Sequence, residues 1–300
     1  PAGLPGLRRT EITTTYADLY AMGITQSYLG FVKPFSDRVA LGFDWSNVGF
    51  DDKELLYAEN KMNLAIGVQP HRKVSFGITL KYLMRDMQLD GTSYGKSSGV
   101  GYDAGLLIQP LKNLRLGVGL YDLGGTQVAY EDKSTETILG QAFKLGISYM
   151  PIDGLILAAD YGDRYHFGAE YILASRLSFR AGVQQDVSGA EKILVPSGGL
   201  SIKFKSLIVE YGYESHPYLE PTHRFSLALQ FSPAVVSITS TVISHNPVFR
   251  SLHRYYESEP FLKVGIKNIS DADLPVDVSL YVPTMMDNPH SQSVTLPPKS

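Results

Sequence analysis

A strict alternation of apolar and polar side chains along short segments constrains this chain more than any other feature. Between Leu114 and Tyr121 the sequence reads Leu-Arg-Leu-Gly-Val-Gly-Leu-Tyr, so that its apolar residues all share one face. Strand side chains alternate with period two, and this segment therefore predicts a strand with one uniformly apolar face. The same module recurs along the chain with almost no helical pattern. The strands must then cover one another in a sandwich, or turn their apolar faces to lipid in a transmembrane barrel.

Composition removes several other classes of protein. A chain of 300 residues can hold one large β domain with room for a second. The net charge of −3 argues against a nucleic-acid partner, which requires a strongly basic surface. The sequence contains no clean 18-residue apolar run, which argues against transmembrane helices. The 19 Tyr, 13 Phe and 28 Gly are typical of a β-rich, turn-rich protein.

The apolar alternation predicts about fourteen strands before Phe231. The turns that follow even-numbered strands are short, whereas those that follow odd-numbered strands are mostly long. Transmembrane barrels show this asymmetry, with short periplasmic turns and longer outside loops. The predicted strands are Glu11–Tyr16, Gln26–Val32, Arg38–Trp45, Lys61–Gln69, Val74–Tyr82, Gly101–Ile108, Leu114–Asp122, Phe143–Tyr149, Leu155–Tyr161, Tyr165–Ile172, Leu177–Gln184, Gly199–Phe204, Leu207–Tyr213 and Arg224–Phe231.

The face opposite the apolar one carries many ionisable side chains. So many charges would be prohibitive in the dry core of a sandwich, but they can pair across a wet lumen. We therefore expect an antiparallel, 14-stranded transmembrane β-barrel over residues 1–231, with these side chains facing the lumen in a structural or permeation role. The predicted lumen-facing residues are Arg38, Asp44, Lys81, Asp103, Arg115, Lys144, Asp160, His166, Glu170, Arg180, Lys203, Glu210 and Arg224.

The short turns also predict the register of two strand pairs. The three-residue turn Ala174–Arg176 places Glu170 opposite Arg180 and Gly168 opposite Gly182, all facing inward. The two-residue turn Lys205–Ser206 pairs Phe204 with Leu207 on the outer face. Tyrosines gather on that outer face, as expected for an aromatic girdle at the membrane surface.

After Phe231 the pattern changes. Three strand-like segments, Val235–Ile243, Phe261–Asn268 and Val276–Val282, are separated by breaks that contain Pro and Asn. An immunoglobulin-like sandwich needs about seven strands in roughly 100 residues. We therefore expect residues 232–300 to be the start of such a domain, incomplete here and lying in the periplasm, because an even strand number returns the chain to the side of the short turns.

Motifs for catalysis or cofactor binding are not supported. The segment Gly99-Val-Gly-Tyr-Asp-Ala104 matches a dinucleotide pattern formally, but it enters a strand where that motif needs a helix. Asp160 and Glu170 face inward on neighbouring strands, an arrangement that could serve acid–base chemistry. With Arg180 and Lys144 nearby, structural ion pairing is the better interpretation. We expect no enzyme activity, metal site or cofactor.

Two short segments carry a resemblance to a known family. Pro1-Ala2-Gly3-Leu4 resembles the end of the Asn-Pro-Ala-Gly-Leu motif that follows the N-terminal plug in FadL-type long-chain fatty-acid transporters. Ser27-Tyr28-Leu29-Gly30-Phe31 and the short turn at Pro34 are more similar to the PorV/PorQ-like branch. The resemblance covers roughly residues 1–231. It implies a bacterial outer-membrane barrel with both ends in the periplasm, whose plug and signal segment would precede Pro1.

The resemblance leaves three functions open. The first is a PorV-like accessory or anchor in protein secretion or surface assembly, with a periplasmic or secretion-machinery protein as partner. The second is a FadL-like channel for uptake of hydrophobic small molecules, with a hydrophobic ligand in the lumen. The third is a structural outer-membrane anchor for a periplasmic scaffold. Outer-membrane lipid surrounds the barrel in all three.

Overall fold

The computed structural model describes residues 1–300 except 8, 37, 53, 131–132, 188–192, 232–235, 245–261, 271–272, 281–289 and 300. The chain divides into two compact units, residues 1–232 and 233–300. No helix in the described part of the chain is long and apolar enough to cross a membrane.

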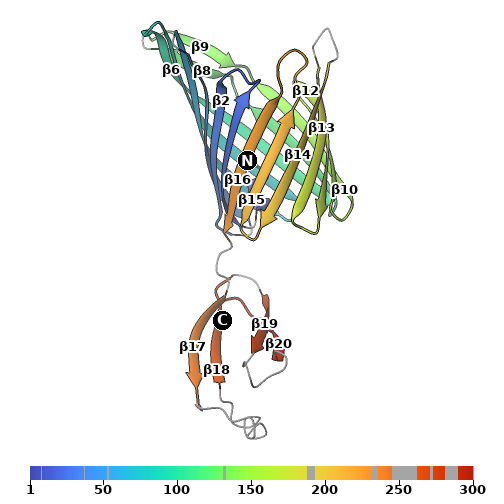
Figure 1. The fold of residues 1–300 in the computed structure, drawn as a ribbon. Helices are drawn as coiled ribbons and strands as arrows, with labels where there is room; N and C mark the ends of the chain where they lie inside the picture. Colours follow the sequence, from blue (N-terminus) through green and yellow to red (C-terminus); the bar gives the residue numbers. More distant parts are fainter. Residues whose placement is uncertain are drawn as a thin grey trace. The chain divides into compact units, whose positions relative to one another are not determined.

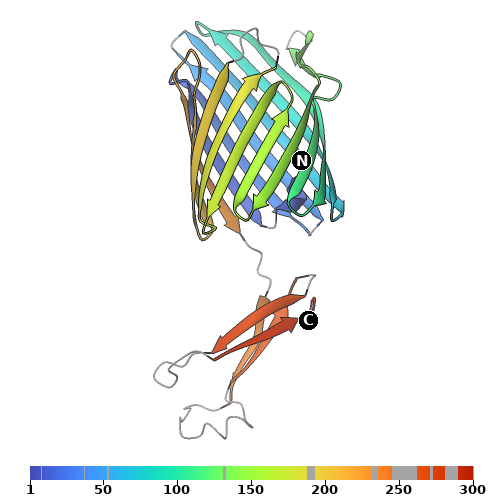
Figure 2. The same ribbon diagram turned by 90° about the vertical axis from the view of Figure 1, so that its right-hand side faces the viewer.

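The first unit is a closed, antiparallel barrel (Figures 1 and 2). Each strand pairs with the next along the ring, and β16 returns to pair with β1, with Thr10 opposite Phe231. The expected ring of fourteen antiparallel strands is confirmed. Its strands are β1 (Thr10–Leu19), β2 (Ile24–Pro34), β3 (Val39–Asp51), β4 (Leu55–His71), β5 (Val74–Leu89), β6 (Thr92–Leu111), β7 (Leu114–Tyr121), β10 (Ala142–Ile152), β11 (Leu155–Tyr161), β12 (Arg164–Leu173), β13 (Leu177–Asp186), β14 (Leu194–Phe204), β15 (Leu207–Glu214) and β16 (Thr222–Phe231).

Several segments expected to be long polar links are strands instead. Ser46–Glu59 and Met84–Ser98 lie between predicted strands and were expected to be links. The first is mostly the end of β3 and the start of β4, and the second contains the end of β5 and the start of β6. Only Asp90 and Gly91 connect β5 to β6, with φ of 50° and 72°. An Asp-Gly pair with two positive φ angles is typical of a tight hairpin turn. The apolar alternation therefore ends before the strands do, because main-chain hydrogen bonds continue the ladder where the outer face is polar.

The segment between β7 and β10, expected to be a long polar link, contains two strands among its described residues. These are β8 (Thr126–Tyr130) and β9 (Thr135–Leu139), both missed by the apolar alternation. β6 pairs with β7 between Ala104 and Leu111, whereas its earlier residues Ser97–Val100 pair with β8. The side chain of Val128 is fully buried. β6 therefore pairs with β7 along one part of its edge and with β8 along another, and the β8–β9 hairpin extends the sheet beyond the ring (Figure 1).

The outer face of the barrel is apolar and exposed. On β12, for example, Phe167 is 57% exposed, and it shares its face with Tyr165 and Tyr171. The tyrosines predicted for the outer face are all among the exposed large side chains: Tyr82, Tyr102, Tyr149, Tyr161, Tyr165, Tyr171, Tyr211 and Tyr213. An exposed apolar surface that runs around a closed barrel is the arrangement of a protein surrounded by lipid.

The N-terminal segment lies inside the barrel (Figure 2). It contains the short 3₁₀ helix η1 (Leu4–Gly6), and it packs on glycines of the inner wall. A Cβ atom at Gly67 would lie 2.6 Å from Cδ of Pro5, and one at Gly77 would lie 2.7 Å from Cβ of Pro1. Glycine lets the segment approach the sheet more closely than any other residue would.

The second unit contains two small antiparallel sheets. β17 (Val236–Ile243) pairs with β18 (Leu262–Asn268), and β19 (Leu274–Leu280) pairs with β20 (His290–Leu296). β20 lies outside the three segments predicted as strands. Val235, Phe261, and residues 281–282 of the predicted third strand fall outside the described residues. An immunoglobulin-like sandwich stays a prediction.

Candidate functional site in the barrel lumen

Polar side chains form three hydrogen-bonded rows on the inner face of β11–β16 and β1. We number the rows first to third, starting from the end of the barrel that carries short turns such as β12–β13. In the first row, the Lys203 ammonium donates to Oε1 of Gln230 at 2.7 Å. Nε2 of Gln230 in turn donates to Oε2 of Glu11 at 2.8 Å. The first row thus links a cation to a carboxylate through an amide.

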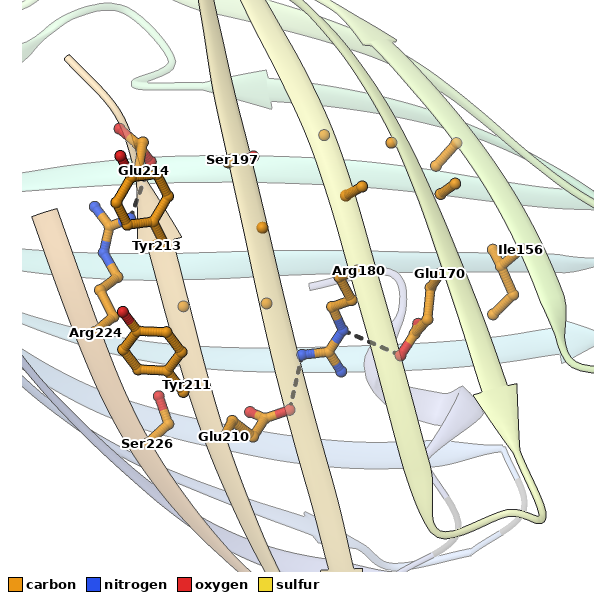
Figure 3. Close-up of a pocket in the computed structure, with 18 residues that line it drawn as sticks. Ile156, Glu170, Arg180, Ser197, Glu210, Tyr211, Tyr213, Glu214, Arg224 and Ser226 are labelled. Atoms are coloured by element: carbon orange, nitrogen blue, oxygen red, sulfur yellow. Dashed lines mark hydrogen bonds and ion pairs between the residues drawn. The ribbon is translucent and has the colours of Figure 1, made fainter. Parts of the chain in front are cut away.

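The second row is centred on Arg180 of β13 (Figure 3). Its Nε donates to Oε1 of Glu170 at 3.0 Å, and its Nη1 donates to Oε1 of Glu210 at 2.8 Å. Glu170 lies opposite Arg180 and Gly168 lies opposite Gly182, as the turn length predicts. One guanidinium therefore bridges carboxylates from two other strands, which fixes the register of this part of the wall.

The third row joins five strands near the opposite end of the barrel. Asp160 Oδ1 lies 2.8 Å from Nδ1 of His166, and Nε2 of the same ring lies 3.2 Å from Oε1 of Gln184. The Gln184 amide donates to Glu214 at 3.4 Å, and Glu214 also accepts from Nη1 of Arg224 at 3.0 Å. Asp160 and Glu170 therefore have separate partners, an arrangement that favours structural pairing over a shared acid–base site.

The opposite wall contains a buried charge cluster. Nζ of Lys81 lies 2.7 Å from Oδ1 of Asp103 and 2.5 Å from Oδ1 of Asp122. The three side chains are only 10–12% exposed. The Thr126 hydroxyl donates to the same Asp122 oxygen at 2.6 Å, and the Asp122 amide donates to Asp103 at 2.9 Å. The cluster joins β5 and β6 to the base of the β8–β9 hairpin.

The remaining predicted residues are more scattered. Asp44 accepts from Nδ2 of Asn63 at 2.7 Å, and Lys144 lies 3.6 Å from Asp163. Arg115 lies on β7, is exposed, and forms no ion pair with a described residue. Arg38 was predicted to open a barrel strand. It lies instead in the β2–β3 turn, because its amide donates to the Ser36 hydroxyl oxygen at 3.2 Å rather than to a neighbouring strand, and β3 begins at Val39.

Sequence reasoning missed several members of these rows. Glu59 and Arg85 form a 2.7 Å ion pair in strand segments that were predicted to be links. Asp122 was placed at the end of a strand, without a partner. Strand periodicity could have found Arg85, because it lies four residues after the predicted inward residue Lys81 and so shares its face of β5. The missed residues of the rows and clusters are Glu11, Glu59, Arg85, Asp122, Thr126, Gln184, Glu214 and Gln230.

Two cavities open from the inner wall. One, of about 470 Å³, lies over the second and third rows and includes Glu170, Arg180 and Arg224. The other, of about 580 Å³, lies beside the N-terminal segment and combines a floor of Leu107, Gly117 and Gly146 with the polar Lys144 and His166. Within the described residues, no three His, Cys, Asp or Glu side chains are grouped as metal ligands.

Comparison with known proteins identifies the fold. No family model matches this sequence, and no curated protein matches it. Among solved structures, the barrel matches the CymD monoaromatic hydrocarbon channel at 15% identity and a TM-score of 0.57, covering 77% of this chain and 91% of that one. It matches the toluene transporter TbuX of Ralstonia pickettii at 13% identity and a TM-score of 0.53, covering 77% and 92%.

A Pseudomonas aeruginosa FadL homologue matches at 12% identity and a TM-score of 0.52, again covering 77% of this chain and 92% of that one. The first of these proteins is described as a hydrocarbon channel and the second as a toluene transporter. The barrel fold that they share with this chain is the fold that the FadL-type resemblance implies, and these matches do not bear on the PorV/PorQ-like branch. The first unit of this chain therefore has the barrel fold of the FadL-type hydrocarbon transporters.

Proposed function

We propose that this protein is a channel of the bacterial outer membrane that takes up hydrophobic small molecules. The observation that carries this proposal is the match of the whole barrel to a monoaromatic hydrocarbon channel and a toluene transporter, at TM-scores of 0.57 and 0.53. This favours the FadL-like alternative over a secretion accessory. The exposed apolar outer wall supports a membrane location.

The cavity beside the N-terminal segment is the candidate binding site. Its floor of Leu107, Gly117 and Gly146 is apolar and smooth, as a flat hydrophobic molecule requires. Lys144 and His166 lie at its edge and could orient a ligand that carries a polar group. The third polar row reaches this cavity through His166, which bonds to Asp160 and Gln184, and the first two rows continue along the wall away from it.

Uptake by intact bacteria tests the proposal, because the outer membrane supplies the barrier that a channel must bypass. Cells lacking their own hydrocarbon channels would express this chain, and the uptake rate of radiolabelled toluene would be measured. Gly117→Leu and Gly146→Leu place a side chain in open lumen space and should slow uptake several-fold. Ala169→Leu adds the same side chain to the outer face and is the matched control.

One result would overturn the proposal. Uptake by cells that carry the folded barrel would equal uptake by cells that carry an empty vector. A migration shift between boiled and unboiled samples on a denaturing gel would show that the barrel had folded in both wild type and variants.

An accessory role in secretion or surface assembly is the second candidate function. The observation that favours it is the exposed apolar surface of the second unit. Ile238 is 68% exposed, and Ile243 and Val264 are also exposed on the small β17–β18 sheet. A strand pair of this kind gains stability when another chain adds to its edge. We place this unit in the periplasm, where a secretion component or a scaffold would cover it.

Co-purification separates these possibilities. A periplasmic protein retained by the full chain, and lost when Ile238→Ser is introduced, would support the accessory or scaffold role. Retention of a lipid-like molecule in native mass spectrometry, without a protein, would support the channel.

A further inference from the structure

The turns at one end of the barrel are strongly basic. This end, called the short-turn end, holds the six connections β2–β3, β4–β5, β6–β7, β10–β11, β12–β13 and β14–β15. Asp153 is the only acidic residue among their described positions. Five of the six connections carry a cation. These cations, called the basic ring, are Arg38, Arg72, Lys73, Lys112, Arg176 and Lys205.

The members of the basic ring are exposed, and none forms an ion pair with a described residue. Pairing within the fold therefore does not account for them. Large apolar side chains flank the same turns and are also exposed. Phe35 is 60%, Leu111 59%, Ile152 61% and Phe204 59% exposed. Arg38, Lys112 and Lys205 thus lie within three residues of exposed apolar side chains at the edge of the outer wall.

The other end of the barrel has the opposite charge. Its described connecting loops contain a single exposed cation, Lys133. They contain five exposed carboxylates: Asp52, Glu54, Asp90, Asp163 and Glu220. The charge is therefore sorted along the barrel axis, which a general need for soluble turns does not explain.

The distribution of the ring identifies the class of partner. The cations lie in turns that follow β2, β4, β6, β12 and β14, and so are spread around the circumference. A docked protein would contact one arc of such a rim, whereas lipid headgroups surround it completely. We propose that the basic ring binds the phosphates of anionic phospholipids in the leaflet at the short-turn end. This rests on the membrane location in the proposed function.

The chemistry of the ring suits this ligand. An Arg guanidinium can donate two parallel hydrogen bonds to one phosphate, and Lys supplies a point charge. A Lys or Arg near an anionic membrane surface increases binding by roughly fivefold. Attraction at exposed sites is screened by salt, so the preference should fall as ionic strength rises. The flanking apolar side chains fix the depth at which the cations meet the headgroups.

The single tryptophan of the chain provides a direct measurement. Trp45 lies on the outer face of β3, opposite Met62 of β4. The turns carrying Arg38, Arg72 and Lys73 lie at the short-turn ends of these two strands. The full chain would be reconstituted in mixtures of phosphatidylglycerol and phosphatidylethanolamine, with brominated acyl chains on one lipid at a time. Stronger quenching of Trp45 by brominated phosphatidylglycerol at equal mole fraction is expected, with a preference of up to about fivefold.

Two sets of variants make the test specific. Arg38→Gln, Arg72→Gln and Lys73→Gln together should remove most of the preference, whereas Arg38→Lys with Arg72→Lys should retain it. Lys133→Gln changes the opposite end and should leave it unchanged. Equal quenching by both lipids in the wild type overturns the proposal. An acidic protein surface would then be the remaining partner for the basic ring. Quenching by neither lipid overturns it differently, by showing that β3 does not face a bilayer.

Discussion

Nζ of Lys81 on β5 forms an ion pair with Oδ1 of Asp122, the residue after β7, at 2.5 Å. The two side chains are only 10% and 12% exposed. Asp103 and Thr126 complete the cluster: Oδ1 of Asp103 also accepts from the Asp122 amide, and Oδ1 of Asp122 also accepts from the Thr126 hydroxyl. The cluster lies where β6 leaves β7 and begins to pair with β8. The cluster therefore connects the β8–β9 hairpin to the barrel where β6 changes partner from β7 to β8.

Removal of the Lys81 cation should destabilise the barrel strongly. Lys81→Met leaves Asp103 and Asp122 buried without their counter-charge, which costs about 3–5 kcal/mol in comparable buried pairs. Unfolding of the refolded protein in urea would measure the change. Lys96→Met is the control, because its ion pair to Asp86 is 3.7 Å long and Lys96 is 57% exposed. A change of less than about 1 kcal/mol is expected there, and equal effects of the two variants would refute the prediction.

The bridge made by Arg180 should show coupling between its two carboxylates. Glu170→Gln and Glu210→Gln each remove one carboxylate charge beside the guanidinium. Glu170 lies directly opposite Arg180, a cross-strand pair that contributes roughly 0.2–1 kcal/mol, whereas Glu210 reaches Arg180 across β14. Because Arg180 is 46% exposed, the effects should lie in the lower part of this range. A double-mutant cycle by urea unfolding would measure the coupling. Strict additivity of the two substitutions would show that the bridge does not act as a unit.

The two faces of the wall can be distinguished by labelling, since the sequence contains no cysteine. Phe167→Cys places a thiol on the exposed outer face, and Gly182→Cys places one on the inner face opposite Gly168. In a reconstituted bilayer, a charged thiol reagent should modify the inner position and a lipid-soluble reagent the outer one. The reverse pattern would contradict the assigned faces.

The glycines beneath the N-terminal segment should be required for its position. Gly77→Val introduces a side chain where Pro1 lies, and the segment must then leave the wall. Ala2, which is 7% exposed, can be replaced by cysteine to report this movement. Ala2→Cys should react much faster with a water-soluble reagent when Gly77→Val is present. Gly117→Val, whose Cβ would meet only Leu107 at 3.9 Å, should not change the rate.

Asn268 should stabilise the second unit. Its buried amide donates at 3.0 Å to the carbonyl oxygens of Leu296 and Pro297, and its oxygen accepts from Ser270. Asn268→Ala leaves these groups without partners, at a cost of about 1–3 kcal/mol. Hydrogen exchange of the full chain should become faster in β18 and β20. Unchanged exchange there would show that the amide does not link the two small sheets.

The sequence determined the features that depend on local periodicity. The apolar alternation in segments such as Leu114–Tyr121 predicted barrel strands, and the charged opposite face excluded a dry core. A turn of three residues was sufficient to place Glu170 opposite Arg180, because strand register follows directly from turn length.

Only the tertiary structure decided what depends on contacts between distant segments. The polar ends of β5 and β6 have no apolar alternation, so nothing local distinguishes them from loops, although Asp90-Gly91 was an available hairpin signal. Lys81 meets Asp122 because β6 changes partner, a choice made by strand pairing across the chain. Only closure of the ring places Pro1 and Pro5 against Gly67 and Gly77 of the inner wall. Alternation is set by each residue and its neighbours, whereas these contacts exist only once the barrel encloses a common interior.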